Sequence, residues 1–226
     1  MENKKQININ LLLSIILLGC FVVWTIMLKT VDVQAIGAND TDIGLATLNI
    51  SFFNAVGVNE IGDKLSDLLF YPIIGSALIF VLIAIIQLIK RKSVFKIDKE
   101  LICALFGYLT IILFYLVFEI VIINYRPILI EGQIEASYPS SHTMISSFIL
   151  LTEIYLTLYF LKGKNKILKY SIVALISLIL IAVVVLRTIS GMHWLSDIIG
   201  ALFLSTGLYF LYVYVVGLLN GNITKE

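Results

Sequence analysis

Long apolar runs constrain this chain more than any other feature of its sequence. A bilayer core about 30 Å thick is crossed by roughly 20 apolar residues in a helix. Six stretches reach or approach that length: residues 11–28, 68–89, 101–123, 143–161, 171–186 and 198–219. With 60% apolar and 14% charged residues, the chain has too little polar surface for an ordinary soluble domain. The sequence therefore predicts an all-α integral membrane protein, one domain over residues 1–226 built as a bundle of six transmembrane helices.

The basic residues predict how this bundle sits in the membrane. Twelve of the 16 Lys and Arg residues lie before the first run, between the second and third, between the fourth and fifth, or after the sixth. Cationic segments are retained on the cytoplasmic side during insertion, so both termini are expected to be cytoplasmic. The remaining four include Arg126 and Arg187. The segments that follow the third and fifth runs then face the outside, and we expect a bacterial plasma membrane.

Two parts of the N-terminal third allow more than one interpretation. The first run could be a signal peptide, because "VQA" at residues 33–35 resembles a cleavage site. Its 18 apolar residues exceed the usual roughly 7 to 15 of such peptides, so we interpret it as a retained span. The segment 29–67 could be an interfacial amphipathic element or a connector that packs over the spans. Both cysteines, Cys20 and Cys103, fall inside apolar runs and indicate no disulfide or metal site.

Three polar clusters occur at the predicted outer ends of the last four runs. They are "NYRP" at 124–127, "PSSH" at 139–142 and "RTISGMHWLSD" at 187–197. The chain has only two histidines, His142 and His193, and both lie in these clusters together with Arg126 and Arg187. Because all three clusters are expected on one membrane face, the sequence predicts that they converge on one functional site.

The residue types in these clusters indicate phosphate chemistry. Two guanidinium groups match the oxygens of a phosphate better than lysines would. Ser140 is placed as the N-cap of the fourth run, where free backbone N–H groups and the positive helix end favour an anion. His193 and Asp197 are four residues apart, so on a helix the carboxylate could accept from one ring nitrogen and orient the other for attack on phosphorus. His142 could then protonate the leaving oxygen.

These residues resemble the type 2 phosphatidic acid phosphatase superfamily, membrane relatives of vanadium haloperoxidases. Its pattern is Lys, six residues and Arg-Pro; then Pro-Ser-Gly-His; then Ser-Arg, five residues, His, three residues and Asp. The chain matches the first block in Arg126-Pro127, the second with Ser141 in place of Gly, and the third in Arg187, His193 and Asp197. Leu186 replaces the serine of the third block, a change expected to have a modest effect at most.

The resemblance implies a function for each matched position. His193 would form a phosphohistidine supported by Asp197, and His142 would act as the acid and later activate water. Phosphate would be held by four matched positions: Arg126, Ser140, the Ser141 backbone and Arg187. It implies no metal or organic cofactor and a helical core like that of acid phosphatases and vanadium haloperoxidases. The expected partners are a phosphorylated lipid substrate and membrane lipids, with no nucleic acid.

Glu119 departs from the pattern, because it occupies the position of the first-block lysine. Three interpretations are open: it is protonated or paired with Arg126, it contacts a substrate group other than phosphate, or the site is degenerate. We favour pairing with Arg126. Glu153, near the middle of the fourth run, is either functional or a neutral acid in an interhelical hydrogen bond, and we favour the hydrogen bond.

We therefore expect a metal-independent lipid phosphatase acting on a phosphate monoester or pyrophosphate lipid at the extracytoplasmic face. Undecaprenyl diphosphate is slightly favoured over phosphatidylglycerophosphate and phosphatidic acid. One alternative is a lipid phosphotransferase that uses the same histidine with a different acceptor. The other is a non-catalytic or transport protein in which Glu119 and Glu153 relay protons. The sequence indicates no oligomeric state.

Overall fold

The computed structural model describes residues 2–221 and confirms an all-α membrane bundle. Within this range, six helices are long and apolar enough to cross a membrane. They are α1 (Glu2–Thr30), α3 (Glu60–Arg91), α4 (Lys99–Ile120), α5 (Ser141–Phe160), α6 (Lys166–Ile189) and α7 (Leu195–Gly221). The prediction that the tail with Lys225 is cytoplasmic falls outside the described residues.

The helices differ from the apolar runs at their ends, most of all in α3. This helix begins at Glu60, eight residues before the predicted start at Leu68. Asn59 is its N-cap, and its side-chain oxygen accepts a hydrogen bond of 3.0 Å from the Gly62 N–H. Acidic Glu60 and Asp63 in the first turn favour a helix N-terminus electrostatically. Two polar turns therefore extend α3 beyond its apolar run, toward the loops that hold the candidate site.

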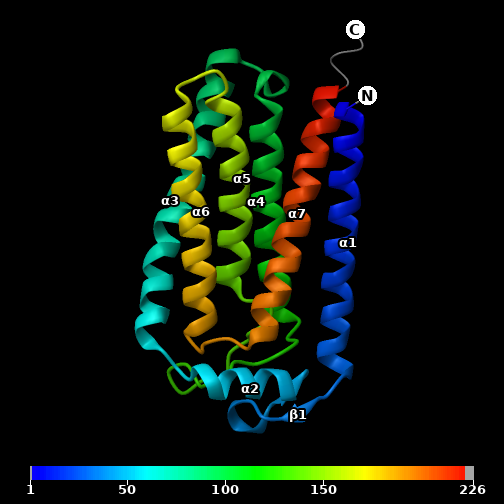
Figure 1. Cartoon of the computed structure of the whole chain (residues 1–226), viewed down its shortest axis with the longest axis vertical. Helices are drawn as coiled ribbons and strands as arrows, with labels where there is room; N and C mark the ends of the chain where they lie inside the picture. Colours follow the sequence, from blue (N-terminus) through cyan, green and yellow to red (C-terminus); the bar gives the residue numbers. More distant parts are fainter. Residues whose placement is uncertain (1, 222–226) are drawn as a thin grey trace.

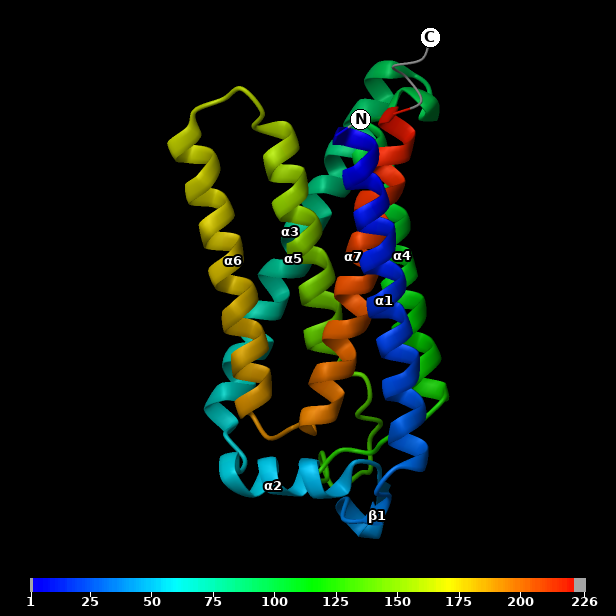
Figure 2. The ribbon, with the colours of Figure 1, turned by 45° about the vertical axis from the view of Figure 1, so that its right-hand side comes forward.

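Helix α5 lies at the centre of the bundle and is the most buried of the six spans. It packs against α3, α4, α6 and α7, whereas α1 packs along α7 on the outside (Figure 1). The hydroxyl of Ser14 on α1 donates to the Gly207 carbonyl at 3.0 Å. Small residues at this contact let the two helices approach closely. In Figure 2, α6 diverges from α7 with distance from the end that carries α2.

The connector between α1 and α3 folds over one end of the bundle. It contains a short antiparallel pair, β1 (Gln34–Ala35) and β2 (Asp42–Ile43), and the helix α2 (Ala46–Val56). Helix α2 lies across the helix ends rather than along them (Figure 1). Its buried Asn49 donates to Ser196 Oγ at 2.9 Å and accepts from the Ser196 N–H at 3.1 Å. The connector therefore packs on the start of α7 and covers this end of the bundle.

The loops that carry the three polar clusters lie at the end of the bundle that α2 covers. The start of α1 and the end of α7 lie at the opposite end (Figure 1). The α6–α7 turn needs Gly191, which has φ +71° and faces the Gly57 carbonyl at a distance that leaves no room for a Cβ. The basic segments 90–99 and 162–169 join spans at the terminus end. The site and the main basic segments thus occupy opposite ends of the bundle.

Candidate active site

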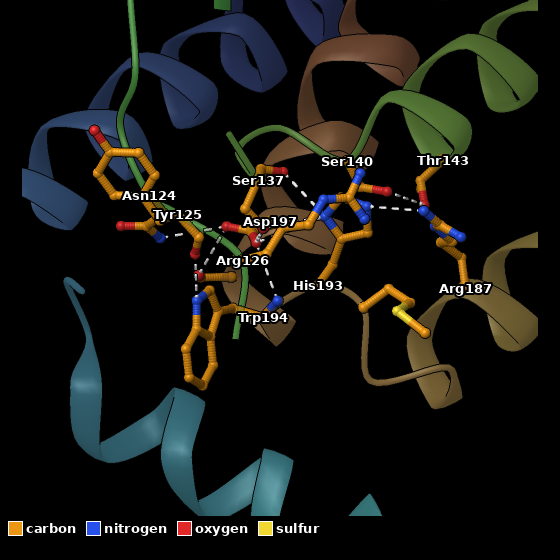
Figure 3. A network of polar contacts seen from close by, with 12 residues as sticks. Asn124, Tyr125, Arg126, Ser137, Ser140, Thr143, Arg187, His193, Trp194 and Asp197 are labelled. Carbon is orange, nitrogen blue, oxygen red and sulfur yellow. Dashed lines mark hydrogen bonds and ion pairs between the residues drawn. The ribbon is translucent and has the colours of Figure 1, made fainter. Parts of the chain in front are cut away.

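The ring of His193 is held in one orientation by hydrogen bonds on both sides. It lies in the α6–α7 turn and is buried. Its Nδ1 is 3.0 Å from the Ser137 carbonyl oxygen, and its Nε2 is 3.2 Å from Arg187 Nη2 (Figure 3). A carbonyl only accepts and a guanidinium only donates, so Nδ1 carries the proton and Nε2 presents a lone pair. The unprotonated Nε2 therefore faces the guanidinium group of Arg187.

The charges around His193 keep it neutral. Burial lowers its pKa well below the ordinary value of 6.5, and Arg187, Arg126 and His142 lower the pKa further. A hydrogen bond to the Ser137 backbone partly opposes this effect. At neutral pH the ring is unprotonated at Nε2, which is the form that can attack phosphorus.

Asp197 supports His193 through Ser137 rather than by a direct hydrogen bond. The separation between His193 Nδ1 and Asp197 Oδ2 is 3.8 Å, too long for a hydrogen bond. The Ser137 hydroxyl donates to Asp197 Oδ2 and its Oγ lies 3.1 Å from His193 Nδ1 (Figure 3). The expectation that the carboxylate accepts directly from the ring is thus wrong, because His193 precedes the start of α7 at Leu195 and does not share a helical face with Asp197.

The carboxylate of Asp197 is fully buried and receives further hydrogen bonds. The Trp194 N–H donates to Oδ2 at 3.0 Å, and Asn124 Nδ2 donates to Oδ1 at 3.3 Å. These donors come from the α6–α7 turn and from the loop after α4. Because a buried charge requires such partners, Asp197 fixes the positions of both loops around His193.

Arg187 is buried between His193 of the α6–α7 turn and the N-terminal turns of α3. Its Nη1 forms an ion pair with Asp63 and lies 3.5 Å from Asp67 Oδ1 and 3.3 Å from Ser66 Oγ. Its Nη2 contacts His193. The buried Nε of Arg187 has no hydrogen-bond partner within residues 2–221. The Nη1 of Arg187 is thus held by carboxylates, while its Nε–H has no acceptor among the described residues.

His142 lies in the first turn of α5, as expected, beside Asp67 of α3. Its Nε2 is 3.1 Å from Asp67 Oδ1, and its ring lies 4.3 Å from the ring of Phe70, centroid to centroid. Its Nδ1 is buried and has no hydrogen-bond partner in the described part of the chain. Ser140 is fully buried at the N-cap position, but its hydroxyl donates to Thr143 Oγ1 at 3.1 Å, so the expected side-chain cap is not formed.

Arg126 pairs with Glu135 instead of Glu119. The side-chain Nε of Arg126 lies 3.1 Å from Glu135 Oε2 but makes no hydrogen bond to it. The backbone N–H of Arg126 donates to the Glu135 carbonyl at 3.0 Å. Glu119 is exposed and, among the described residues, forms no ion pair with Arg126. The favoured pairing was therefore wrong, because the loop after α4 turns back and brings Glu135 next to Arg126. Glu153 is buried on α5, and its Oε1 has no hydrogen-bond partner among residues 2–221.

A small polar cleft opens beside His193. It encloses about 300 Å³ of empty space, counting its open mouth. Its lining includes Glu119, Arg126, Ser137, Ser141 and His193. The three polar clusters predicted to converge do meet at this end of the bundle, with Glu119 on the cleft wall.

Several residues at the site were missed by the sequence reasoning. They are Asp63, Asp67, Asn124, Glu135 and Ser137. Asn124 is the first residue of the quoted NYRP cluster and Ser137 lies two residues before PSSH, so their polar side chains were a usable signal. The spacing of Asp63 and Asp67 by four residues would have placed them on one face of α3, had the helix been extended beyond its apolar run.

The fold and this cluster define a polytopic helical membrane protein with a histidine site at one end. Residues 101–220 match the family model of the PAP2 superfamily, which covers just over half of the chain. The chain therefore belongs to the PAP2 superfamily. The matched region contains α4 to α7, while α1, α2 and α3, including Asp63 and Asp67, precede it.

A solved structure of the same type supports the whole fold. It is the crystal structure of a transmembrane PAP2 type phosphatidylglycerolphosphate phosphatase from Bacillus subtilis, and its TM-score to this chain is 0.60. The match covers 88% of this chain and 94% of that chain at 19% sequence identity. At this identity the match establishes the PAP2 membrane phosphatase fold. No curated protein matches the chain.

Proposed function

We propose that this protein is a membrane lipid phosphatase that transfers a phosphoryl group to His193 and then to water. The observation that carries this proposal is the orientation of His193, with Nδ1 committed to the Ser137 carbonyl and Nε2 facing Arg187. A buried, neutral histidine in this tautomer beside a guanidinium is suited to attack a phosphate bound by that guanidinium.

Phosphate binding is assigned to Arg126, Arg187 and the N-terminus of α5. The Nε atoms of both arginines are buried and have no hydrogen-bond partner among residues 2–221. The first backbone N–H groups of α5, at Ser141 and His142, have no acceptor within the helix and lie at its positive end. Together these groups supply donors for several oxygens of one phosphate. Substrate oxygens also replace His193 Nε2 as the partner of Arg187 Nη2, which frees the nucleophile.

The first chemical step forms a bond between His193 Nε2 and phosphorus as the phosphorus–oxygen bond to the lipid breaks. His142 gives its proton to the leaving lipid oxygen. The phosphorylated imidazole gains positive charge, which the Ser137 carbonyl at Nδ1 and the nearby Asp197 carboxylate stabilise.

The second step releases inorganic phosphate. His142, now neutral, takes a proton from a water molecule that attacks phosphorus, and the phosphorus–nitrogen bond breaks. This returns His193 to its neutral tautomer and His142 to its protonated form, so the cycle balances. The pair of histidines thus alternates between acid and base as microscopic reversibility requires.

The lipid tail is assigned to a groove on the membrane side of the site. This groove encloses about 590 Å³ of empty space, counting its open mouth, and lies between α5, α6 and α7, where α6 and α7 diverge (Figure 2). Its lining is mostly aliphatic and includes Leu151, Leu180, Val184 and Leu202. Val184 stands one helical turn before Arg187, so a lipid tail in the groove would place its phosphate end near the guanidinium group of Arg187.

The proposed substrate is a phosphate monoester or pyrophosphate lipid, with three candidates. Phosphatidylglycerophosphate is the substrate class named for the solved relative, and phosphatidic acid and undecaprenyl diphosphate present the same terminal phosphate. The location proposed for the site is the extracytoplasmic interface, because the basic segments 90–99 and 162–169 occupy the opposite end of the bundle.

Phosphate release from the three lipids tests the proposal. Purified protein in detergent is incubated with each lipid in the presence of EDTA, and wild type is compared with His193→Ala. We expect release by wild type from at least one lipid and none by the variant. Loss of the lipid phosphate without release of inorganic phosphate, in the presence of an acceptor alcohol, would indicate transfer instead. Equal release by both proteins would refute the role of His193.

A further inference from the structure

The carboxylate of Asp67 lies against His142 from a helix outside the matched family region. Asp67 Oδ1 is 3.1 Å from His142 Nε2. A carboxylate only accepts, so Nε2 carries the hydrogen and Nδ1 is the nitrogen left to exchange a proton. That Nδ1 is buried, with no hydrogen-bond partner among residues 2–221. We infer that Asp67 is a positioning residue that aims His142 Nδ1 at the leaving oxygen and stabilises the protonated ring when it forms, an inference that rests on the proposed function.

The charges that face His142 show why such a carboxylate is needed. Arg187 of α6 and Arg126 of the loop after α4 both present positive charge to the ring. Asp63 of α3 acts in the opposite direction but is itself paired with Arg187. Phe70 of α3 contributes an apolar face, and His193 across the site is neutral. Asp67 is the carboxylate in direct contact with the ring, so it is placed to stabilise the imidazolium form of His142 against these two guanidiniums.

Asp67 also connects His142 to Arg187, the arginine proposed to bind phosphate. The same Oδ1 atom lies 3.5 Å from Arg187 Nη1, and Arg187 Nη2 contacts His193. Both histidines are thus tied to one arginine, His142 through Asp67 and His193 directly. The Asp67 side chain is 46% exposed, so its ion pairs contribute little to folding and a neutral replacement is expected to fold.

Substrates with different leaving groups can distinguish a positioning role of Asp67 from a purely structural role. A lipid alkoxide is a poor leaving group and needs a proton in the transition state, which makes the general acid worth a factor of about 10² to 10⁴. The p-nitrophenolate ion is a stable anion and leaves without one. Loss of the acid should therefore slow hydrolysis of a lipid phosphate monoester far more than hydrolysis of p-nitrophenyl phosphate.

The test compares Asp67→Asn with wild type on phosphatidic acid and p-nitrophenyl phosphate. We expect kcat for phosphatidic acid to fall about 100-fold, while kcat for p-nitrophenyl phosphate stays within about threefold and KM changes little for both. The alkaline limb of the kcat profile for phosphatidic acid should move to lower pH, because the imidazolium loses its counter-charge. Glu60→Gln is the matched control, since Glu60 pairs with exposed Lys64 on the same helix and its replacement should leave kcat for both substrates unchanged.

Other outcomes overturn the inference in distinguishable ways. An equal loss on both substrates, with an unchanged alkaline limb, would show that Asp67 supports the site as a whole and would refute the positioning role alone. No turnover by wild type of p-nitrophenyl phosphate or of any of the three candidate lipids, or equal turnover by His193→Ala, would refute the proposed function and the inference with it. If Asp67→Asn does not fold, Asp67→Ser removes the same charge and gives the same comparison.

Discussion

Ser137 determines how the buried carboxylate of Asp197 acts on His193. Its hydroxyl donates to Asp197 and its carbonyl oxygen accepts from His193 Nδ1, so one residue sets both the tautomer and the charge support. The sequence placed His193 and Asp197 in one site but could not reveal this bridge. Four-residue spacing brings side chains together only within a helix, and His193 lies in the turn before α7.

Ser137→Ala tests the bridge, because it removes the hydroxyl and keeps the backbone carbonyl. A buried carboxylate that loses a donor costs about 1–3 kcal/mol, and about 1.4 kcal/mol is tenfold in rate, so kcat should fall roughly 10- to 100-fold. KM should change little, since the phosphate donors remain. Ser177→Ala, whose hydroxyl bonds only the Val173 carbonyl within α6, is the control. Steady-state kinetics on phosphatidic acid measure both, and an unchanged kcat in Ser137→Ala would contradict the bridge.

Glu119 lies on the cleft wall without the expected arginine partner, so under the proposed function we expect it to act on substrate as a nearby negative charge. Glu119→Gln should keep kcat, and Glu119→Lys should lower KM by up to about fivefold, because exposed charge pairs are worth about 1 kcal/mol at most. The decrease should shrink at high salt. Kinetics at two ionic strengths check this. A complete loss of activity in folded Glu119→Gln would instead assign Glu119 a direct catalytic role.

At the scale of elements, hydropathy located the spans but not the polar turns that complete the site. Helix α3 starts two turns before its apolar run, and those turns carry Asp63 and Asp67 to Arg187 and His142. The loop after α4 places Glu135 beside Arg126 through pairing of Tyr125 with Ala136. Such loop contacts depend on tertiary packing, which local sequence patterns do not specify.

The groove between α6 and α7 predicts a dependence on the lipid tail. Leu202→Trp should fill the groove and raise KM for a long-chain phosphatidic acid by roughly tenfold, equivalent to the lost burial of about two methylene groups. The KM for p-nitrophenyl phosphate should not change, because that substrate has no tail. Ile16→Trp on the exposed face of α1 is the control. Equal effects on both substrates would exclude this groove as the tail site.

At the scale of the whole molecule, the opposite placement of basic segments and site predicts one orientation in the membrane. Single cysteines are placed at Glu131, in the exposed loop beside the site, or at Lys164, in the exposed loop at the other end, after replacement of Cys20 and Cys103 by alanine. In intact cells, a membrane-impermeant maleimide should label the cysteine at 131. The cysteine at 164 should react only after permeabilisation. The reverse pattern would place the site on the cytoplasmic side.

The phosphohistidine is tested most directly with His142→Ala and radiolabelled p-nitrophenyl phosphate. This substrate needs no acid to leave, whereas hydrolysis of the intermediate needs His142 as the base. The account predicts a burst of p-nitrophenol close to one equivalent per protein and a phosphoprotein that is stable in alkali, labile in acid and located at His193. The double variant with His193→Ala should give neither. A burst that persists in the double variant, or phosphate bound at another residue, would contradict the account.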